Sequence, residues 1–349
     1  ETCDVRETLE PFQFKDFTYW RFESDPTQKS RMLNDFGSDV KKRLKVTKPA
    51  QPVADTKRPD IPQTGADSVQ SEAAEESSPS APTYQTYVVD PFPGRGDFAK
   101  IGDAIAAAPQ GSKIIVREGT YRENLHLSKA LEIIGEGDRK KIRVVAQEGN
   151  ALRCDVAMAR ISGMTFRREV GSKHYSVWIN EGAVEIDDCI IENLSLSGMC
   201  IAGAATSPTI QRTVFQNCGE SGLLIEKSAC PVIENCEFVG NALSGVVVWD
   251  PGTLPELRRC VSKSNKQSGY YFTKEAQCLM ESCEAAGNTL AGIAVSGGSD
   301  PKLRSCVSRD NDLSGIYIYE DGRGMLENCK VIENGTSGVA IQEGGAPKI

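Results

Sequence analysis

The sequence contains few aromatic residues, no long apolar run and no excess of basic charge. Aromatic side chains make up 7% of the 349 residues, whereas there are 32 glycines. This composition favours many short, closely stacked turns over a helical bundle. No apolar run reaches the roughly 18 residues of a membrane-spanning helix, so we expect no membrane partner. The formal net charge of −8 disfavours nucleic-acid binding, because nucleic-acid-binding surfaces are strongly basic.

Signatures of common catalytic and metal sites are also missing. There is no G-x-S-x-G, no H-E-x-x-H and no phosphate-binding loop. The only histidines are His126 and His174, and the cysteines lack C-x-x-C spacing, which argues against zinc. His126 lies in an expected strand and His174 in an expected loop, where a general-base role is the less favoured interpretation. We therefore predict no metal, no cofactor and no enzymatic activity.

Three zones differ in composition. Residues 1–47 form a small N-terminal segment with alternating aromatic residues between Phe12 and Phe22. Residues 48–83 are rich in Pro, Ser, Ala and Glu and have almost no large apolar side chains. They cannot bury enough surface to offset chain entropy, so we predict a disordered linker. Residues 84–349 form the third zone, whose sequence is regular.

The third zone repeats every 23 or 24 residues. A glycine preceded by Ser or Ala returns at Gly198, Gly222, Gly245, Gly269, Gly292, Gly315 and Gly338. Asparagine recurs at Asn193, Asn217, Asn241, Asn265, Asn288, Asn311 and Asn334. A further column holds Cys189, Thr213, Cys236, Cys260, Cys283, Cys306 and Cys329. One period shared by all these columns indicates stacked structural coils.

We predict an all-β parallel solenoid of about ten coils. Each repeat holds short segments of alternating polarity between Gly, Asn and Pro turns, and one repeat alone cannot bury its apolar side chains. In stacked coils about 4.8 Å apart, the first and third residues after each glycine face inward. Residues 98–108 predict a short amphipathic helix, ended by Pro109, that caps the first coil. The strands expected for that coil are residues 113–116, 125–127 and 131–134.

The asparagine and cysteine columns have structural explanations. Asn tolerates left-handed turns and bonds locally, so its column indicates stacked amides in a turn. Cysteine behaves as a small apolar residue, and a continuous run of five neighbouring rungs cannot pair fully into disulfides. We therefore expect free thiols and a reducing, cytoplasmic compartment. The sequence stops in mid-coil by its own period, which predicts further coils or a capping partner.

Two parts of the third zone carry a family resemblance. Residues 98–123 read F-x-x-I-x-x-A-I-x-A-A-P-x-G-x-x-I-x-V-x-x-G-x-Y-x-E, which resembles the opening of pectin methylesterases and related pectin-lyase-like folds. Residues 315–334 and 338–347 resemble CASH-type repeats. Such repeats occur in β-helix F-box ubiquitin-ligase subunits, in the Shc-binding spindle protein and in bacterial signalling-associated β-helix proteins. The resemblance spans about residues 86–349 and implies a right-handed parallel β-helix, the hand also favoured by parallel crossovers.

The enzyme sites of these folds do not carry over to this sequence. It lacks the pectin-esterase Q-D-T-L motif, the polygalacturonase G-H-G and R-I-K motifs, the epimerase D-P-H motif and the calcium-binding aspartates of pectate lyases. Adjacent carboxylates occur at Asp187–Asp188 and Glu320–Asp321, and a glycosidase needs two carboxylates across the scissile bond. We interpret both pairs as solvated turn residues.

The strands that follow the repeated glycines predict an outward binding face. Their second and fourth residues should point away from the core, and several of them are aromatic. The candidate face comprises Trp178, Glu226, Trp249, Asp250, Tyr271, Tyr317, Tyr319 and Glu320. Aromatic side chains beside carboxylates can stack on sugars or anchor a peptide. The alternative is that they shield the sheet or pack against residues 1–47.

We expect a non-catalytic recognition or scaffold module that binds protein partners in a cytosolic signalling or ubiquitin-ligase-like context. The missing catalytic motifs and the thiol column favour this function. The alternative is a carbohydrate-binding or carbohydrate-active β-helix protein, with a polyuronate or another glycan as its ligand. A second alternative is a purely structural spacer.

Overall fold

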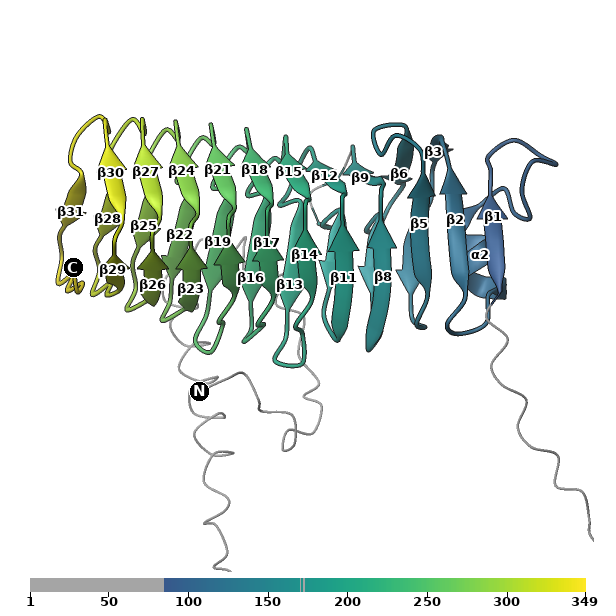
Figure 1. The fold of residues 1–349 in the computed structure, drawn as a ribbon, viewed down its shortest axis with the longest axis horizontal. Coiled ribbons are helices and arrows are strands. Elements are labelled where there is room, and N and C mark those ends of the chain that lie inside the picture. Colours follow the sequence, from purple (N-terminus) through teal and green to yellow (C-terminus); the bar gives the residue numbers. More distant parts are fainter. Residues whose placement is uncertain (1–84, 170, 172) are drawn as a thin grey trace, which may run out of the picture. The chain divides into compact units, whose positions relative to one another are not determined.

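The computed structural model describes residues 85–349, apart from residues 170 and 172. The predicted N-terminal segment (1–47) and linker (48–83) lie outside the described residues. Within the described part, the predicted parallel solenoid is confirmed: strands alternate between three parallel sheets, and successive coils stack along one axis (Figure 1). Each sheet takes one strand from every coil, so equivalent residues of the repeat become neighbours.

We name the sheets A, B and C in the order in which each full coil visits them. Sheet A contains, in spatial order, β1 (Thr86–Val89), β2 (Lys113–Arg117), β5 (Glu132–Glu136), β8 (Met158–Ser162), β11 (Ala183–Asp187), β14 (Thr209–Gln211), β17 (Val232–Glu234), β20 (Glu256–Arg258), β23 (Gln277–Glu281), β26 (Asp300–Arg304) and β29 (Met325–Glu327). Sheet B contains β3 (Gly119–Tyr121), β6 (Ile142–Ala146), β9 (Thr165–Arg168), β12 (Ile190–Asn193), β15 (Val214–Gln216), β18 (Glu237–Val239), β21 (Val261–Lys263), β24 (Glu284–Ala286), β27 (Val307–Arg309) and β30 (Lys330–Ile332). Sheet C contains β4 (Leu125–Leu127), β7 (Leu152–Cys154), β10 (Val177–Ile179), β13 (Met199–Ala202), β16 (Leu223–Glu226), β19 (Val246–Trp249), β22 (Tyr270–Thr273), β25 (Ile293–Val295), β28 (Ile316–Ile318) and β31 (Val339–Ile341).

The predicted capping helix is α2 (Ile101–Ala107), which lies beside the first strands of the solenoid (Figure 1). It buries Ile101, Ala104 and Ile105 and packs against β1, β2 and β4. The Glu123 carboxylate accepts hydrogen bonds from the backbone N–H groups of Ile101 and Gly102, at 2.9 and 2.8 Å. A negative charge at this end of a helix also interacts favourably with its dipole.

The first full coil differs in one detail from the prediction. Its strands are β2, β3 and β4, whereas residues 131–134 overlap β5, which begins the second coil. The three residues of β3 are too few to show an alternating pattern. Only the pairing of β3 with β6 and the burial of Tyr121 reveal it as a strand.

Large side chains from sheets B and C fill the interior. The Phe215 and Phe238 rings stack with centroids 4.8 Å apart, and Phe238 meets the Tyr270 ring edge-on at 6.5 Å. In the coil after Phe238 the inward residue of sheet B is the small Ser262, and the buried Tyr270 hydroxyl donates to the Glu284 carbonyl at 3.2 Å. Burying one such ring stabilises the fold by about 1.5–3 kcal/mol, so these aromatics are core residues.

The cysteine column runs along the turn between sheets A and B. Cys236, Cys260, Cys283 and Cys306 are buried free thiols, and Cys329 is half-buried. Each thiol lies between two coils; the Cys283 sulfur, for example, is 3.4 Å from the carbonyl oxygens of Glu281 and Leu257. Stacking of the repeat therefore explains this column.

The asparagine ladder is real but shorter than the sequence spacing predicts. Its members are Asn241, Asn265, Asn288, Asn311 and Asn334. The Asn265 side-chain amide donates to the Asn288 Oδ1 atom at 2.9 Å, and the same oxygen accepts the Asn265 backbone N–H at 3.1 Å. The other rungs repeat this geometry, so the Oδ1 atom of each asparagine accepts the backbone N–H of the equivalent turn in the coil before it.

Asn193 and Asn217 lie outside this ladder. Ladder residues follow the first residue of a sheet B strand by four positions, and Asn217 follows Val214 by only three. Asn217 is exposed in a left-handed turn (φ 54°), and Cys218 takes the ladder position, donating its backbone N–H to Asn241 at 3.1 Å. The Asn193 side chain instead caps a local turn by accepting the backbone N–H groups of Ser195 and Leu196.

Candidate functional site

The predicted binding residues all lie on the outer side of sheet C or in the turns that follow its strands. Four strands of sheet C carry an aromatic residue of this set: β10 carries Trp178, β19 Trp249, β22 Tyr271 and β28 Tyr317. Glu226 is the last residue of β16. The turns that follow the strands contain Asp250, Tyr319 and Glu320. All are half-buried except Glu320, which is exposed. They extend from β10 to β28, and several of them are brought together: Trp178, Trp249 and Tyr271 pack against one apolar cluster, and the Tyr319 hydroxyl donates to the Tyr271 hydroxyl at 3.4 Å.

An outward aliphatic stripe, which the sequence analysis did not identify, lies between these aromatics. Cys200, Leu224 and Val247 occupy equivalent positions on β13, β16 and β19, and they are only 1%, 4% and 8% exposed. Trp178, Trp249 and Tyr271 pack against this group. Part of the predicted face therefore serves to shield the sheet.

The aromatic rings of this face are also engaged with other side chains. The Arg153 guanidinium lies 4.9 Å from the ring centroid of Trp178, and the Lys274 ammonium lies 4.5 Å from that of Trp249. Tyr317 and Tyr319 stack on each other at 4.4 Å. Cation–π contacts of this kind contribute about 0.5–1 kcal/mol at exposed sites. The rings therefore form a packed layer in place of an open platform for sugar stacking.

The predicted carboxylates occupy a recurring turn between sheets C and A. Lys227, Asp250, Lys274 and Glu320 all adopt left-handed backbone angles there, with φ between 47° and 76°. Glu226 pairs with Lys227 at 3.3 Å. Burial raises the pKa of the Asp250 carboxyl, and the nearby Glu226 carboxylate raises it further. Because this turn recurs from coil to coil, the geometry of the repeat accounts for these positions.

The predicted acidic pair Asp187–Asp188 is not simply solvated. Asp187 is 4% exposed and forms ion pairs with Arg212 and, at 3.7 Å, with Arg160. Asp188 accepts a hydrogen bond from Arg139 at 2.7 Å. The expectation of solvated turn residues is therefore wrong for Asp187, because stacking brings arginines from an earlier and a later coil against it, whereas Asp188 is exposed in its turn.

The two histidines lie apart. His126, on β4, contacts the Asp155 carboxylate through its Nε2 atom at 2.7 Å. His174 lies in the loop before β10, where burial, Arg168 and Lys173 all lower its pKa. Among the described residues, no group of three or more His, Cys, Asp or Glu side chains is arranged to hold a metal ion.

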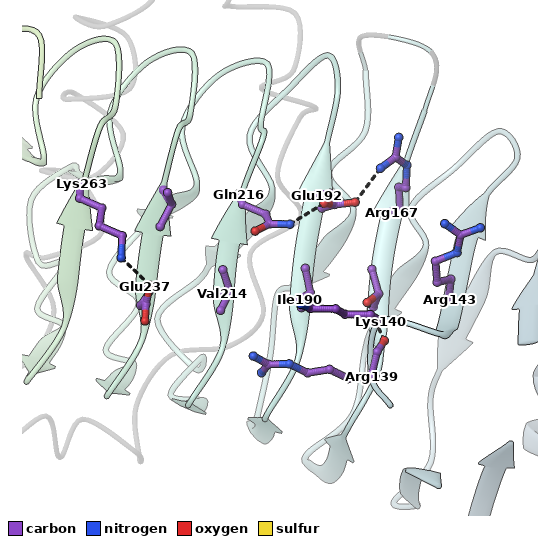
Figure 2. Close-up of a pocket in the computed structure, with 12 residues that line it drawn as sticks. Arg139, Lys140, Arg143, Arg167, Ile190, Glu192, Val214, Gln216, Glu237 and Lys263 are labelled. Carbon is purple, nitrogen blue, oxygen red and sulfur yellow. Dashed lines mark hydrogen bonds and ion pairs between the residues drawn. The ribbon is translucent and has the colours of Figure 1, made fainter. Parts of the chain in front are cut away.

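A groove of about 540 Å³ runs along the outer side of sheet B, across six neighbouring strands from β6 to β21 (Figure 2). Its lining residues are Arg139, Lys140, Arg143, Thr165, Arg167, Ile190, Glu192, Val214, Gln216, Glu237, Val239 and Lys263. Ile190, Val214 and Val239 contribute apolar surface, and polar side chains surround it. The groove is therefore an elongated depression with an apolar floor and hydrogen-bonding walls.

Positive charge prevails in this groove. It contains five Arg or Lys side chains and two carboxylates, a net charge of +3 within a chain of net charge −8. Glu192 accepts hydrogen bonds from Arg167 and Gln216, both at 2.7 Å, and Glu237 pairs with Lys263 at 3.0 Å. Both carboxylates are thus already paired, which leaves the excess positive charge near β6.

The groove could not be predicted from the sequence because no local motif encodes it. Each coil contributes one to three residues, and the lining extends from Arg139 to Lys263. Outward positions of a solenoid need no apolar residue, so they carry no periodic signal. Only a strand-by-strand alignment of the outward residues of sheet B could have revealed the cluster of basic side chains.

Comparisons with known proteins concern the fold. The family model described as "Right handed beta helix region" matches residues 148–278 and 244–349. No curated protein matches this chain by sequence. In the described residues, no helix is long and apolar enough to span a membrane.

Three solved structures illustrate the structural similarity. The A-module of the Azotobacter vinelandii mannuronan C-5 epimerase AlgE6 is 14% identical, with a TM-score of 0.51 over 69% of this chain and 73% of that chain. ORF18 of Geobacillus virus E2 is 12% identical, with a TM-score of 0.53 over 69% of this chain and 57% of that chain. An alginate lyase from a Paenibacillus species is 13% identical, with a TM-score of 0.51 over 75% of this chain and 99% of that chain. At these identities the similarity establishes a shared fold.

Proposed function

This chain belongs to the right-handed β-helix region family, and we propose that it is a carbohydrate-binding protein that holds an extended glycan in the sheet B groove. The observation that carries the proposal is the groove itself, a continuous depression across six strands from β6 to β21. A sugar polymer has apolar ring faces and hydroxyl edges. The apolar floor and the hydrogen-bonding walls match these two features.

The proposed function is binding without cleavage. Glycoside hydrolysis needs one carboxylic acid to protonate the leaving oxygen and a second carboxylate as base or nucleophile. The two groove carboxylates, Glu192 and Glu237, are held in ion pairs with Arg167 and Lys263. The hydrogen bond that Arg167 donates to the Glu192 carboxylate also raises the pKa of the Arg167 guanidinium, as expected for a stable ion pair.

A protein-binding function in a cytosolic signalling or ubiquitin-ligase-like context is the second candidate. The half-buried aromatic residues Trp178, Trp249 and Tyr271 on the outer side of sheet C favour it, because partly exposed aromatic side chains are enriched in protein contacts. The thiols of the cysteine column are free, whereas Cys230, outside this column, is disulfide-bonded, so the expectation of free thiols holds for the column and is wrong for Cys230.

A steric block of the groove tests the glycan proposal. Val214 and Val307 belong to the same outward column of sheet B, but only Val214 lines the groove. Binding to a panel of neutral and acidic polysaccharides is measured by affinity electrophoresis and calorimetry. We expect Val214→Trp to weaken binding at least tenfold and Val307→Trp to leave it unchanged. The proposal is wrong if no polysaccharide binds, or if both variants bind like the wild type.

A further inference from the structure

The turn between β5 and β6 projects a group of basic residues over the groove. We call residues 137–141 (Gly-Asp-Arg-Lys-Lys) the basic finger. Arg139 anchors the finger: its guanidinium donates to Asp188 at 2.7 Å and to the Arg212 carbonyl at 3.1 Å. The Arg139 carbonyl in turn accepts the Thr165 hydroxyl at 2.8 Å. These bonds reach three later coils, so the finger is fixed across the corner between sheets A and B.

Lys140, in the anchored finger, and Arg143, on β6, both line the groove toward its β6 end (Figure 2). Both side chains are exposed, and in the described residues neither has a carboxylate within 4 Å. Within the part of the chain that the structure describes, the hydrogen bond of Arg143 is a long one, donated to the Thr120 hydroxyl at 3.4 Å. Arg167 and Lys263 differ, because Glu192 and Glu237 already neutralise them. The uncompensated charge of the groove is therefore concentrated on Lys140 and Arg143.

We propose that Lys140 and Arg143 form an anion subsite, and that the ligand of the groove is a glycan bearing carboxylate or sulfate groups. This inference rests on the proposed glycan-binding function. The Arg143 guanidinium offers a planar set of donors that fits an oxyanion bidentately, and the Lys140 ammonium supplies a mobile point charge. The apolar floor beside them takes the sugar ring that carries the anionic group.

The lining residues argue against a nucleic acid in this groove. None of the twelve is aromatic, so there is no ring on which an unpaired base could stack. The carboxylates of Glu192 and Glu237 also line the groove beyond the subsite, where a continuous phosphate backbone would approach them. A sugar polymer with one anionic group at the Lys140–Arg143 end avoids this repulsion.

Matched polysaccharides test the subsite directly. Polygalacturonate and its fully methyl-esterified form share a backbone and differ in charge, and dextran sulfate against dextran separates sulfate from carboxylate recognition. We expect wild-type protein to bind at least one charged polymer tenfold or more tightly than its neutral counterpart. Its affinity should fall with rising salt, because binding releases counterions.

Substitutions in the groove test whether Lys140 and Arg143 cause the preference for the charged polymer. Lys140→Met combined with Arg143→Met should reduce affinity for the charged polymer to that for the neutral one and flatten the salt dependence. Lys330→Met is the control, because Lys330 is exposed in the same outward column as Arg143 but lies outside the groove. Circular dichroism and the thermal midpoint verify that each variant folds.

Each outcome separates the inference from the function on which it rests. Equal binding of charged and neutral polymers, blocked by Val214→Trp, overturns the anion subsite and leaves glycan binding intact. Absence of binding to every polysaccharide overturns both. Retention of full affinity by the Lys140/Arg143 double variant also overturns the subsite. If oligo(dT) binds as tightly as the charged glycan, the groove is a general polyanion site and the assignment to a glycan is wrong.

Discussion

Replacing Asn265 with alanine removes an interior rung of the asparagine ladder. The Asn265 side chain is fully buried and forms five hydrogen bonds. Its Oδ1 atom accepts the backbone N–H and the side-chain amide of Asn241, at 3.1 and 2.9 Å. Its Nδ2 atom donates to the Phe238 carbonyl, to Ser262 Oγ and to Asn288 Oδ1, at 3.2, 3.0 and 2.9 Å.

The magnitude of the effect follows from the groups that lose their partner. The alanine variant leaves the Asn241 backbone N–H buried without an acceptor, which costs about 1–3 kcal/mol. Loss of the remaining bonds adds about 1 kcal/mol for each that water cannot replace. We therefore expect Asn265→Ala to lower the free energy of unfolding by about 3–5 kcal/mol, a large part of the stability of an ordinary domain.

Urea denaturation monitored by circular dichroism measures this difference, provided that the m-value is unchanged. Hydrogen exchange adds a local readout, since the Asn241 amide should exchange much faster in the variant. Asn217→Gly is the matched control: Asn217 is exposed, outside the ladder and in a left-handed turn that glycine adopts without strain. A loss below about 1 kcal/mol for Asn265→Ala, or equal effects of the two substitutions, would refute the argument that ladder amides satisfy the turns.

Two further predictions concern individual carboxylates. Glu123→Gln should destabilise the protein by about 1 kcal/mol, because an amide replaces the charged group that caps α2 through both oxygens. Thermal unfolding measures the effect, with Glu148→Gln as an exposed control. Equal unfolding midpoints of the two variants would contradict the prediction. Burial raises the pKa of folded Asp250, so its ionisation costs stability as the pH rises above the unfolded value. Asp250→Asn should therefore gain stability relative to wild type between about pH 4 and pH 7 in urea titrations, and a constant difference across this range would count against the assignment.

Much of the fold could be predicted because the interior imposes a period. Each coil must place residues of similar size and polarity over those of its neighbours, so the inward residues after each glycine and the cysteine column recur every 23 or 24 residues. The asparagine ladder shows that the spacing of residues in the sequence does not by itself decide which residues stack. Asn217 fits the spacing, yet pairing of Val214 with Glu237 places Cys218 in the ladder. Strand register, which hydrogen bonding sets, decides which residues stack.

The candidate site could be predicted only in part. The alternation of the strands correctly placed Trp249, Tyr271 and Tyr317 on the outside of sheet C. It could not show that Trp249 faces a lysine or that Tyr317 stacks on Tyr319. These contacts depend on rotamers and on which residues occupy the neighbouring coils.

The sequence by itself determined that this chain is a stacked β-solenoid, because burying a core in identical coils leaves a repeating pattern. Tertiary structure alone decided where its charges gather. Arg139 donates hydrogen bonds to Asp188 and to the Arg212 carbonyl, in two later coils, and thereby fixes the turn that carries Lys140 into the lining of the groove. The physical reason is that outward side chains escape the packing constraint of the core. Their positions follow no period, and only the stacked coils bring them together.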